Sequence, residues 1–181
     1  MRVITGSARG RKLIAPPGLS TRPTLEMVKE AIFSIIQFEL EGARILDLFA
    51  GSGQMGIEAL SRGAQSCVFV DTDKESQQAI RRNLETTGFG LAAKISGTDA
   101  FSYLKGSTGE YDIAFLDPPY KKGALDTLLP AVAQRMSAGG VIVCETEKSE
   151  ILPEPVGSFL LKKQYHYGKT KVTVYRMPEQ E

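Results

Sequence analysis

The fold is decided by the stretch Asp47-Leu48-Phe49-Ala50-Gly51-Ser52-Gly53-Gln54-Met55-Gly56. An apolar run at 44–49 leads into three glycines spaced as G-x-G-x-x-G, and a helical pattern follows them. A strand, a tight glycine loop and a helix in succession are typical of a nucleotide-binding α/β unit, because the glycines let the backbone approach the ligand. Asp71 comes 20 residues after Gly51, at the end of the next apolar run, where an acid accepts ribose hydroxyls. We predict a nucleotide-type ligand bound by Phe49, Gly51, Gly53, Asp71 and Thr72.

From residue 43 onward, apolar runs alternate with helical patterns. Continuous apolar strands suit a parallel sheet that is covered by helices on both faces. Two further apolar runs near the end predict an antiparallel hairpin. Expected strands are 44–49, 66–70, 92–96, 112–116 and 140–145, expected helices are 53–62, 74–86, 99–105 and 124–136, and the expected hairpin pairs 158–161 with 172–175. The predicted class is therefore α/β and Rossmann-like, with a mostly parallel sheet and an antiparallel C-terminal hairpin.

Residues 1–42 are expected to form an N-terminal extension on a main domain of residues 43–181. Strand-like runs at 2–5 and 12–15 flank a glycine-bracketed turn, which predicts a short β-hairpin. After the break at Pro16-Pro17-Gly18, apolar residues recur at helical spacing from Leu25 to Leu40. Thr24 is the expected N-cap of that helix.

Composition is that of an ordinary globular chain, with 42% apolar and 24% charged residues. No apolar run approaches the roughly 20 residues of a membrane span, and no signal peptide is apparent, so we expect a cytoplasmic protein. Two cysteines, Cys67 and Cys144, are expected as small buried hydrophobes, and His166 is the only histidine. This inventory argues against a zinc site or a histidine-dependent nucleophile, so we expect no metal.

Charge is unevenly distributed. Residues 1–25 and 155–178 each hold five basic residues and no acidic one, whereas residues 26–154 between them hold 12 basic and 19 acidic residues. Basic ends around an acidic middle suggest a polyanion held at the edges of the molecule, although an ordinary solvated surface is an equal alternative. At the hairpin turn, Arg9, Arg11 and Lys12 are placed to hold RNA phosphates.

The turn Asp117-Pro118-Pro119-Tyr120 follows the apolar run at 111–116. Its prolines fix the backbone and donate no hydrogen bond, so an acid, carbonyl groups and an aromatic ring are held in a stiff arrangement. That combination suits a flat ring that carries an amino group. Asp117 and the Pro118 carbonyl would accept hydrogen bonds from the amine and offset charge in the transition state, while Tyr120 stacks on the ring. We predict these three residues as catalytic.

The glycine loop by itself does not distinguish S-adenosylmethionine from NAD, because either ligand fits its pattern. The Asp117–Tyr120 turn favours S-adenosylmethionine, because it has a use in the methylation of an amino group and none in hydride transfer. Asp47, just before the loop, would attract a cationic amino-acid end or sulfonium and repel a pyrophosphate. These features favour S-adenosylmethionine over NAD. Asp99, followed by Ala100, is placed to bond the adenine amine, and a helix N-cap is the alternative or additional role of Asp99.

The chain resembles the bacterial 16S ribosomal RNA (guanine-N2)-methyltransferase family, within the class I amino methyltransferases. The resemblance rests on the Asp117–Tyr120 turn, the Asp47–Gly56 loop and three further stretches over nearly the whole chain. Those stretches are the N-terminal Arg2-Val3-Ile4 with Arg9-Gly10-Arg11-Lys12-Leu13, the segment Thr21-Arg22-Pro23-Thr24 with Val28-Lys29-Glu30, and Gly56-Ile57-Glu58-Ala59-Leu60-Ser61-Arg62-Gly63. Gln54-Met55 departs from the small or apolar residues common in the family.

The resemblance implies a seven-stranded sheet with a reversed last strand, S-adenosylmethionine as donor and one guanine of small-subunit rRNA as target. It also implies that Arg22 and Thr24 help to close the donor site. We expect a monomer that recognises 16S rRNA within an assembled or assembling subunit. The rival hypotheses are a DNA adenine-N6 methyltransferase, a non-catalytic nucleotide-dependent RNA-binding module and an NAD oxidoreductase.

Overall fold

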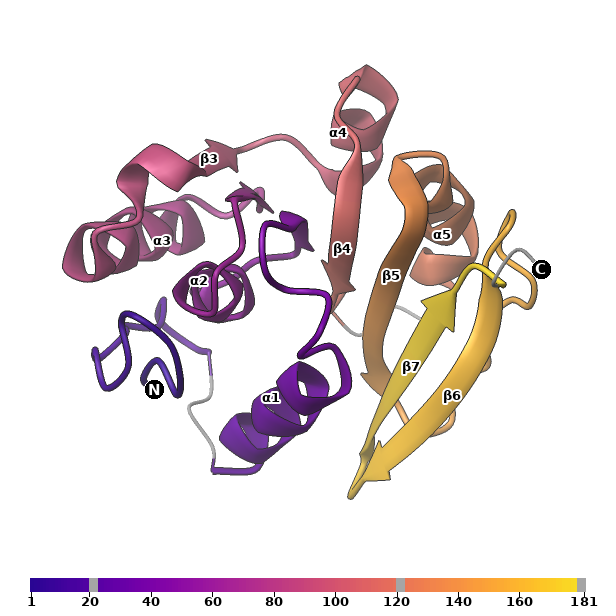
Figure 1. The fold of residues 1–181 in the computed structure, drawn as a ribbon, viewed down its shortest axis with the longest axis horizontal. Helices are drawn as coiled ribbons and strands as arrows, with labels where there is room; N and C mark the ends of the chain where they lie inside the picture. Colours follow the sequence, from indigo (N-terminus) through magenta and orange to yellow (C-terminus); the bar gives the residue numbers. More distant parts are fainter. Residues whose placement is uncertain (20–22, 120–122, 179–181) are drawn as a thin grey trace.

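The computed structural model describes residues 1–19, 23–119 and 123–178 of the 181-residue chain. Its centre is a seven-stranded sheet with the order β3-β2-β1-β4-β5-β7-β6 (Figure 1). The strands are β1 (Arg44–Leu48), β2 (Ser66–Val70), β3 (Ala93–Ser96), β4 (Tyr111–Leu116), β5 (Met136–Glu147), β6 (Leu160–Tyr167) and β7 (Thr170–Arg176). Strands β1 to β5 are parallel, and β7 is antiparallel to both of its neighbours. The predicted mostly parallel sheet with an antiparallel C-terminal hairpin is confirmed.

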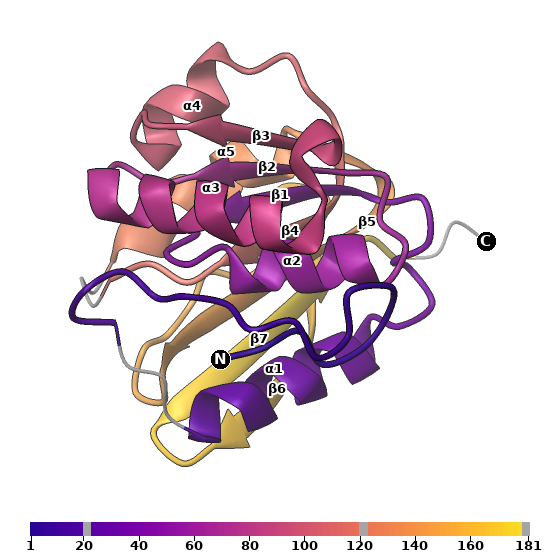
Figure 2. The same ribbon diagram turned by 90° about the vertical axis from the view of Figure 1, so that its left-hand side faces the viewer.

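Helices cover both faces of the sheet. They are α1 (Pro23–Ile35), α2 (Gln54–Ser61), α3 (Lys74–Thr87), α4 (Ala100–Gly106) and α5 (Ala124–Ala133), with a 3-10 turn η1 (Gly90–Ala92) before β3. Figures 1 and 2 show α1, α2 and α3 on one face, with the N-terminal segment outside them, and α4 and α5 on the other. Ile45 and Phe115 face the first layer, whereas Leu46 and Leu116 face the second. Burial on both faces explains the continuous apolar strands.

The order of the strands reverses between β1 and β4. From β1 the chain proceeds outward to β2 and β3, then returns to place β4 on the other side of β1. In open α/β sheets the crevice beyond the carboxyl ends of the strands at such a reversal is where ligands bind. The glycine loop follows β1 and the Asp117 turn follows β4, so the two motifs meet at this edge.

The N-terminal segment, residues 1–19, differs from the expected hairpin of two strands. Only one antiparallel bridge, Arg2 with Lys12, joins its two arms. The amides of Ile4 and Thr5 instead donate to the Glu58 carboxylate of α2, at 2.9 and 3.0 Å. The next part of the segment is bonded to α2 as well, through the Ser7 amide and the Ser61 carbonyl oxygen at 2.8 Å. Backbone groups paired with a helix are not available for a β-ladder, which is why the hairpin is so short.

The boundary between residues 1–42 and 43–181 stays a prediction. The segment and α1 share a hydrophobic core with the main sheet, and Val3 and Phe33 lie in the same buried cluster as Ile45 and Ile57.

Several element ends differ from the sequence-based expectation. Helix α1 begins at Pro23, so Thr24 lies within its first turn and is not the N-cap; proline suits the first helical position because no partner is needed for its missing amide. The helix ends at Ile35, although Leu40 beyond it is buried. Strand β5 begins four residues early, at Met136, through a register shift opposite β4. No helix in the described part of the chain is long and apolar enough to cross a membrane.

The C-terminal hairpin is longer than predicted. Its strands continue through Tyr165-His166-Tyr167, which had been expected to form the connection, and the chain turns at Gly168 with φ of 59°. Alternating aromatic residues in an antiparallel pair are well suited to a pleated surface, which explains the extension.

Candidate functional site

The glycine loop is held to the end of β2 by Asp71. The two oxygens of this carboxylate accept hydrogen bonds from the Gly51 amide at 2.8 Å and the Asp73 amide at 2.9 Å. A carboxylate oxygen has a second lone pair, so Asp71 retains the capacity to accept bonds from a ribose. Phe49, at the start of the loop, has φ of 61°, which is uncommon for a bulky residue and concentrates at functional sites.

Asp47 lies beneath the same loop. It is 4% exposed, and its Oδ2 accepts the Gly56 amide of α2 at 3.0 Å. Burial, with smaller contributions from the negative charges of Asp117 and Asp71, raises the pKa of Asp47 to about 8 against the opposing effect of the Gly56 hydrogen bond. Gly56 permits this close packing, because a Cβ there would stand 2.4 Å from the Phe69 ring. Asp47 therefore holds α2 in place beneath the crevice, and a cationic ligand bound there would favour its ionised form.

Asp99 and Thr72 follow the ends of β3 and β2 and are exposed. Asp99 is the N-cap of α4 and accepts the Ser102 amide at 2.9 Å; hydrogen bonding to Ser102 lowers the pKa of Asp99. Ala100, the first residue of α4, is buried. The alternative role foreseen for Asp99 is confirmed, and its contact with adenine stays a prediction.

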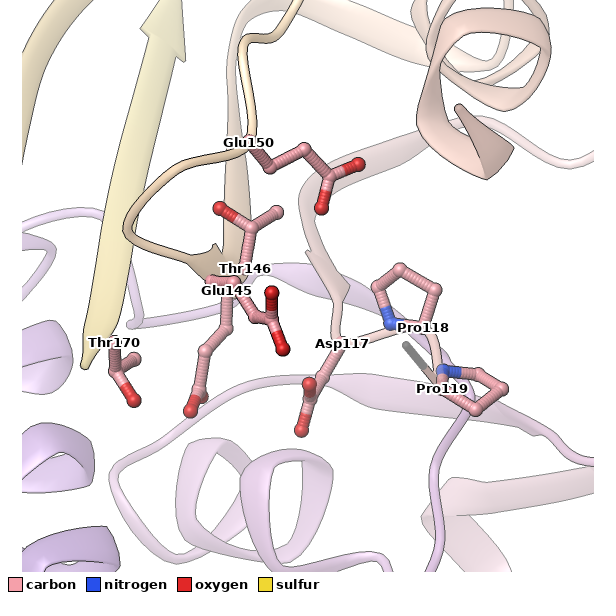
Figure 3. A pocket seen from close by; sticks show the side chains of 8 residues that line it. Asp117, Pro118, Pro119, Glu145, Thr146, Glu150 and Thr170 are labelled. Atoms are coloured by element: carbon pink, nitrogen blue, oxygen red, sulfur yellow. The ribbon is translucent and has the colours of Figure 1, made fainter. Parts of the chain in front are cut away.

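Asp117 follows β4 directly and keeps solvent-exposed surface. Leu116 pairs with Cys144, so Asp117 and Glu145 are the next residues on adjacent parallel strands. Their side chains line one small pocket with Pro118 and Pro119 (Figure 3), and its volume is about 20 Å³. The protein around the carboxylate removes water and raises the pKa of Asp117 to about 6. Burial, and then the charge of Asp117, raises the pKa of Glu145 to about 8.

A second, larger groove lies away from these motifs. It has a volume of about 580 Å³ and runs between α3 and the edge strand β3, where Leu91 and Ile95 line it. Because β3 lies at the sheet edge and β4 is three strands away, this groove is separate from the crevice at the strand reversal.

The N-terminal segment is joined to the glycine loop by one buried side chain, Asn83 of α3. Its Nδ2 donates to the carbonyl oxygens of Ile14 and Ser52, both at 2.9 Å, and its Oδ1 accepts the Ile14 amide at 2.8 Å. The three predicted RNA-binding residues, Arg9, Arg11 and Lys12, are exposed on this segment. The structure thus connects the segment that carries them to the predicted donor loop.

Three predicted site residues are not placed by the structure. Arg22 and Tyr120 lie outside the described residues, and so does the side chain of Thr24. Their roles stay predictions.

Sequence reasoning did not find Glu58, Asn83 and Glu145. Nothing in the pattern around Glu58 or Asn83 signals a partner more than 50 residues away in the chain. Glu145 did have a signal, because an acid ends an apolar parallel strand and ligands bind at such ends.

Comparison with known proteins identifies the family. A family described as "Conserved hypothetical protein 95" matches residues 1–176. The chain belongs to this family. It is 45% identical to the Bacillus subtilis (strain 168) protein named "Putative rRNA methyltransferase YlbH", over 97% of this chain and 98% of that one. Identity to the Escherichia coli (strain K12) "Ribosomal RNA small subunit methyltransferase D" is 31%, over 99% of this chain and 91% of that one.

A solved structure agrees with this assignment. The Escherichia coli protein described as "Putative methyltransferase yhhF" superimposes with a TM-score of 0.85 at 32% identity, over 99% of both chains. The resemblance seen in the motifs is therefore confirmed, and the fold is that of a class I methyltransferase.

Proposed function

We propose that this protein transfers a methyl group from S-adenosylmethionine to the exocyclic N2 amine of one guanine in 16S rRNA. The observation that carries the proposal is the position of Asp117, which ends β4 beside the glycine loop of β1 at the reversal of the sheet. The kinship with rRNA methyltransferases supports the same reaction class and polymer.

The residues around the crevice fit a cationic donor. Asp47, Asp71 and Asp117 act on one another electrostatically there, since the last two raise the pKa of the first. A sulfonium and an ammonium group would relieve this repulsion, whereas the pyrophosphate of NAD would add to it. Phe49, Gly51, Gly53 and Asp71 would hold the donor, with Thr72, Asp99 and Ala100 toward its adenosine end and Arg22 and Thr24 closing the site. When bound, S-adenosylmethionine supplies an electrophilic methyl group on a sulfur that leaves as a neutral thioether.

Asp117 and Pro118 would act on the guanine. The lone pair of its N2 amine is delocalised into the ring, so the amine is a weak nucleophile. Hydrogen bonds from N2 to the Asp117 carboxylate and the Pro118 carbonyl offset the positive charge that develops as the N–CH₃ bond forms and the S–CH₃ bond breaks. The amine then loses one proton, and Asp117, with a pKa raised to about 6, is suited to receive it. Tyr120 stacks on the base and fixes its plane.

The RNA is held outside this crevice by the N-terminal segment, where exposed Arg9, Arg11 and Lys12 contact phosphates. Such contacts read shape and position more than sequence. A protein of this size therefore recognises a preassembled RNA surface of the small subunit, and it acts as a monomer in the cytoplasm.

The test is to incubate the protein with donor labelled in the methyl group and with small ribosomal subunits, naked rRNA or DNA, then digest the products to nucleosides. We expect N2-methylguanosine from subunits, and more of it than from naked rRNA. N6-methyladenosine from DNA would favour the adenine-N6 methyltransferase instead. Calorimetric titration with S-adenosylmethionine and with NAD tests the NAD oxidoreductase, which would bind NAD and not S-adenosylmethionine. An Asp117→Ala variant that retains full cellular function would favour a non-catalytic RNA-binding module.

A further inference from the structure

Glu145 is a carboxylate that the proposed chemistry does not use. It is half-buried in β5, directly after the last residue of β5 that pairs with β4, and so lies next to Asp117 in the register of the sheet. Within residues 1–19, 23–119 and 123–178, neither carboxylate has a hydrogen-bond donor that lowers its pKa. Two desolvated acids without donors destabilise each other, so this pair is built for a ligand that brings N–H groups.

A second polar group at the pocket also lacks a partner. Thr146 lines the pocket, is 8% exposed, and its Oγ1 has no hydrogen-bond partner among the described residues. Figure 3 shows the Thr146 side chain directed away from the Asp117 carboxylate, as expected for the strand neighbour of Glu145, so this hydroxyl is not counted among the acceptors of the pair. A volume of about 20 Å³ accommodates a group of the size of one water, such as an amino group, and not a whole ring.

The nature of that ligand follows from the donors it must bring. A metal ion is not favoured, because in the part of the chain that the structure describes no three acidic, cysteine or histidine side chains are grouped to hold one. One edge of guanine carries the N2 amine and the N1–H side by side, so it offers donors to two adjacent carboxylates. Carboxylates are also the natural acceptors for exocyclic amines of bases.

We propose that Glu145 selects guanine by accepting the N1–H of the target base while Asp117 accepts its N2 amine. This inference rests on the proposed function and assigns the choice of base to a residue outside the Asp117–Tyr120 turn. With Glu145 ionised, adenine would fail at the same position, since the atom beside its amine is an unprotonated N1. Its lone pair would face the Glu145 oxygens, and an unpaired polar contact of this kind discriminates strongly between substrates.

The test compares wild-type protein with Glu145→Gln and with the control Glu85→Gln. Glu85 is exposed on α3 and does not line the pocket, and its substitution removes one carboxylate in the same way. The measurements are kcat and KM for N2-methylguanosine formation on unmethylated small ribosomal subunits, the donor Kd and the midpoint of thermal unfolding. For Glu145→Gln we expect kcat/KM to fall about 10- to 100-fold, as for loss of a base-reading contact, with the donor Kd unchanged within about twofold.

The unfolding midpoint separates this role from a structural one. At pH 8.5, where both carboxylates are mostly ionised, removing one of the two should raise the unfolding midpoint of Glu145→Gln while its activity falls, whereas loss of a structural contact would lower both. Glu85→Gln should keep wild-type kcat/KM within about twofold, as a solvent-exposed substitution does. Equal losses in the two variants, a lowered midpoint, or unchanged kcat/KM in Glu145→Gln would each overturn the inference.

The two proposals fail in different ways. If the wild-type protein forms no N2-methylguanosine on subunits, DNA or rRNA, the proposed function fails and Glu145 loses this role with it. If the wild type forms N2-methylguanosine and Glu145→Gln forms it equally well, the function stands and only the assignment of Glu145 falls.

Discussion

Two groups of carboxylates in this protein have opposite surroundings. Glu58 is fully buried, and it accepts the amides of Ile4 and Thr5 and the Nε of Arg62 at 2.9 to 3.0 Å, with the Lys29 Nζ at 3.6 Å. Asp117 and Glu145 are neighbours on adjacent strands without such donors in the part of the chain that the structure describes, and their pKa values are raised.

The difference separates structure from function. The Glu58 carboxylate is surrounded by donors from three parts of the chain, so it holds the N-terminal segment, α1 and α2 together. Asp117 and Glu145 are left with unused acceptor capacity, which a folded protein retains where a ligand will use it. Removing a member of the first group should therefore cost stability, and removing a member of the second should cost activity.

Asp117→Ala should show the largest effect. Without the carboxylate that accepts the target amine, methyl transfer should slow by about 100- to 1,000-fold, the loss typical of one transition-state hydrogen bond. Single-turnover methylation of small subunits measures this. The unfolding midpoint should stay level or rise, and a variant with wild-type turnover would remove Asp117 from the chemistry.

Glu58→Ala should reverse that pattern. It leaves the buried ammonium of Lys29 and two backbone amides without their acceptor, and breaking a buried pair in this way costs about 3 to 5 kcal/mol of unfolding free energy. Urea denaturation checks this. The control is Glu85→Ala on the exposed face of α3, which should stay within about 0.5 kcal/mol of wild type. Equal stability of the two variants would contradict the role of Glu58.

The N-terminal segment, which Glu58 holds against α2, carries charged side chains that should affect RNA binding and not stability. Changing Arg9, Arg11 and Lys12 together to Gln should raise KM for subunits and reduce the slope of log affinity against log salt by about 3, one for each lost phosphate contact. Filter binding at several salt concentrations measures the slope. Lys105→Gln, on the opposite face of the sheet in α4, should leave the slope unchanged.

The smallest effect should be the dependence of stability on pH. Asp47, Asp117 and Glu145 have folded-state pKa values raised to about 8, 6 and 8. Their protonated forms favour the folded state, so this stabilisation is complete below pH 4 and is lost as the pH rises toward 8. Thermal melts should show a lower midpoint at pH 8.5 than at pH 5.5. Glu145→Gln should have a smaller difference, and an equal or larger one would argue against the repelling pair.

Much of the fold was predictable because it depends on local patterns. Apolar runs bounded by glycines placed β1 and β2 within one residue of their observed ends, and the helices between them followed from spacing. The misses depend on tertiary contacts. The N-terminal hairpin is shorter than the strands expected at 2–5 and 12–15 because Glu58 and Ser61 accept amides of this segment, and the start of β5 at Met136 depends on a register shift against β4.

The site was predictable in part for a related reason. Asp71 and Asp117 end apolar strands and stand in motifs, so their positions follow from the chain order alone. Whether a carboxylate is paired depends on which donors the fold brings near, and sequence pattern carries no signal for that. Glu145 could be recognised as a site residue only from the register of β4 and β5, which places it beside Asp117.

The contact of the N-terminal segment with α2 also limits which sequences the segment can tolerate. A side chain at Gly6 would place its Cβ 1.8 Å from the Ser61 carbonyl oxygen, whereas at Gly10, four residues on, it would meet nothing within 4 Å. Both glycines have positive φ, so Asn is the substitute that Gly10 should accept most readily. In a saturation library, position 6 should therefore retain glycine alone, and position 10 should retain glycine together with asparagine.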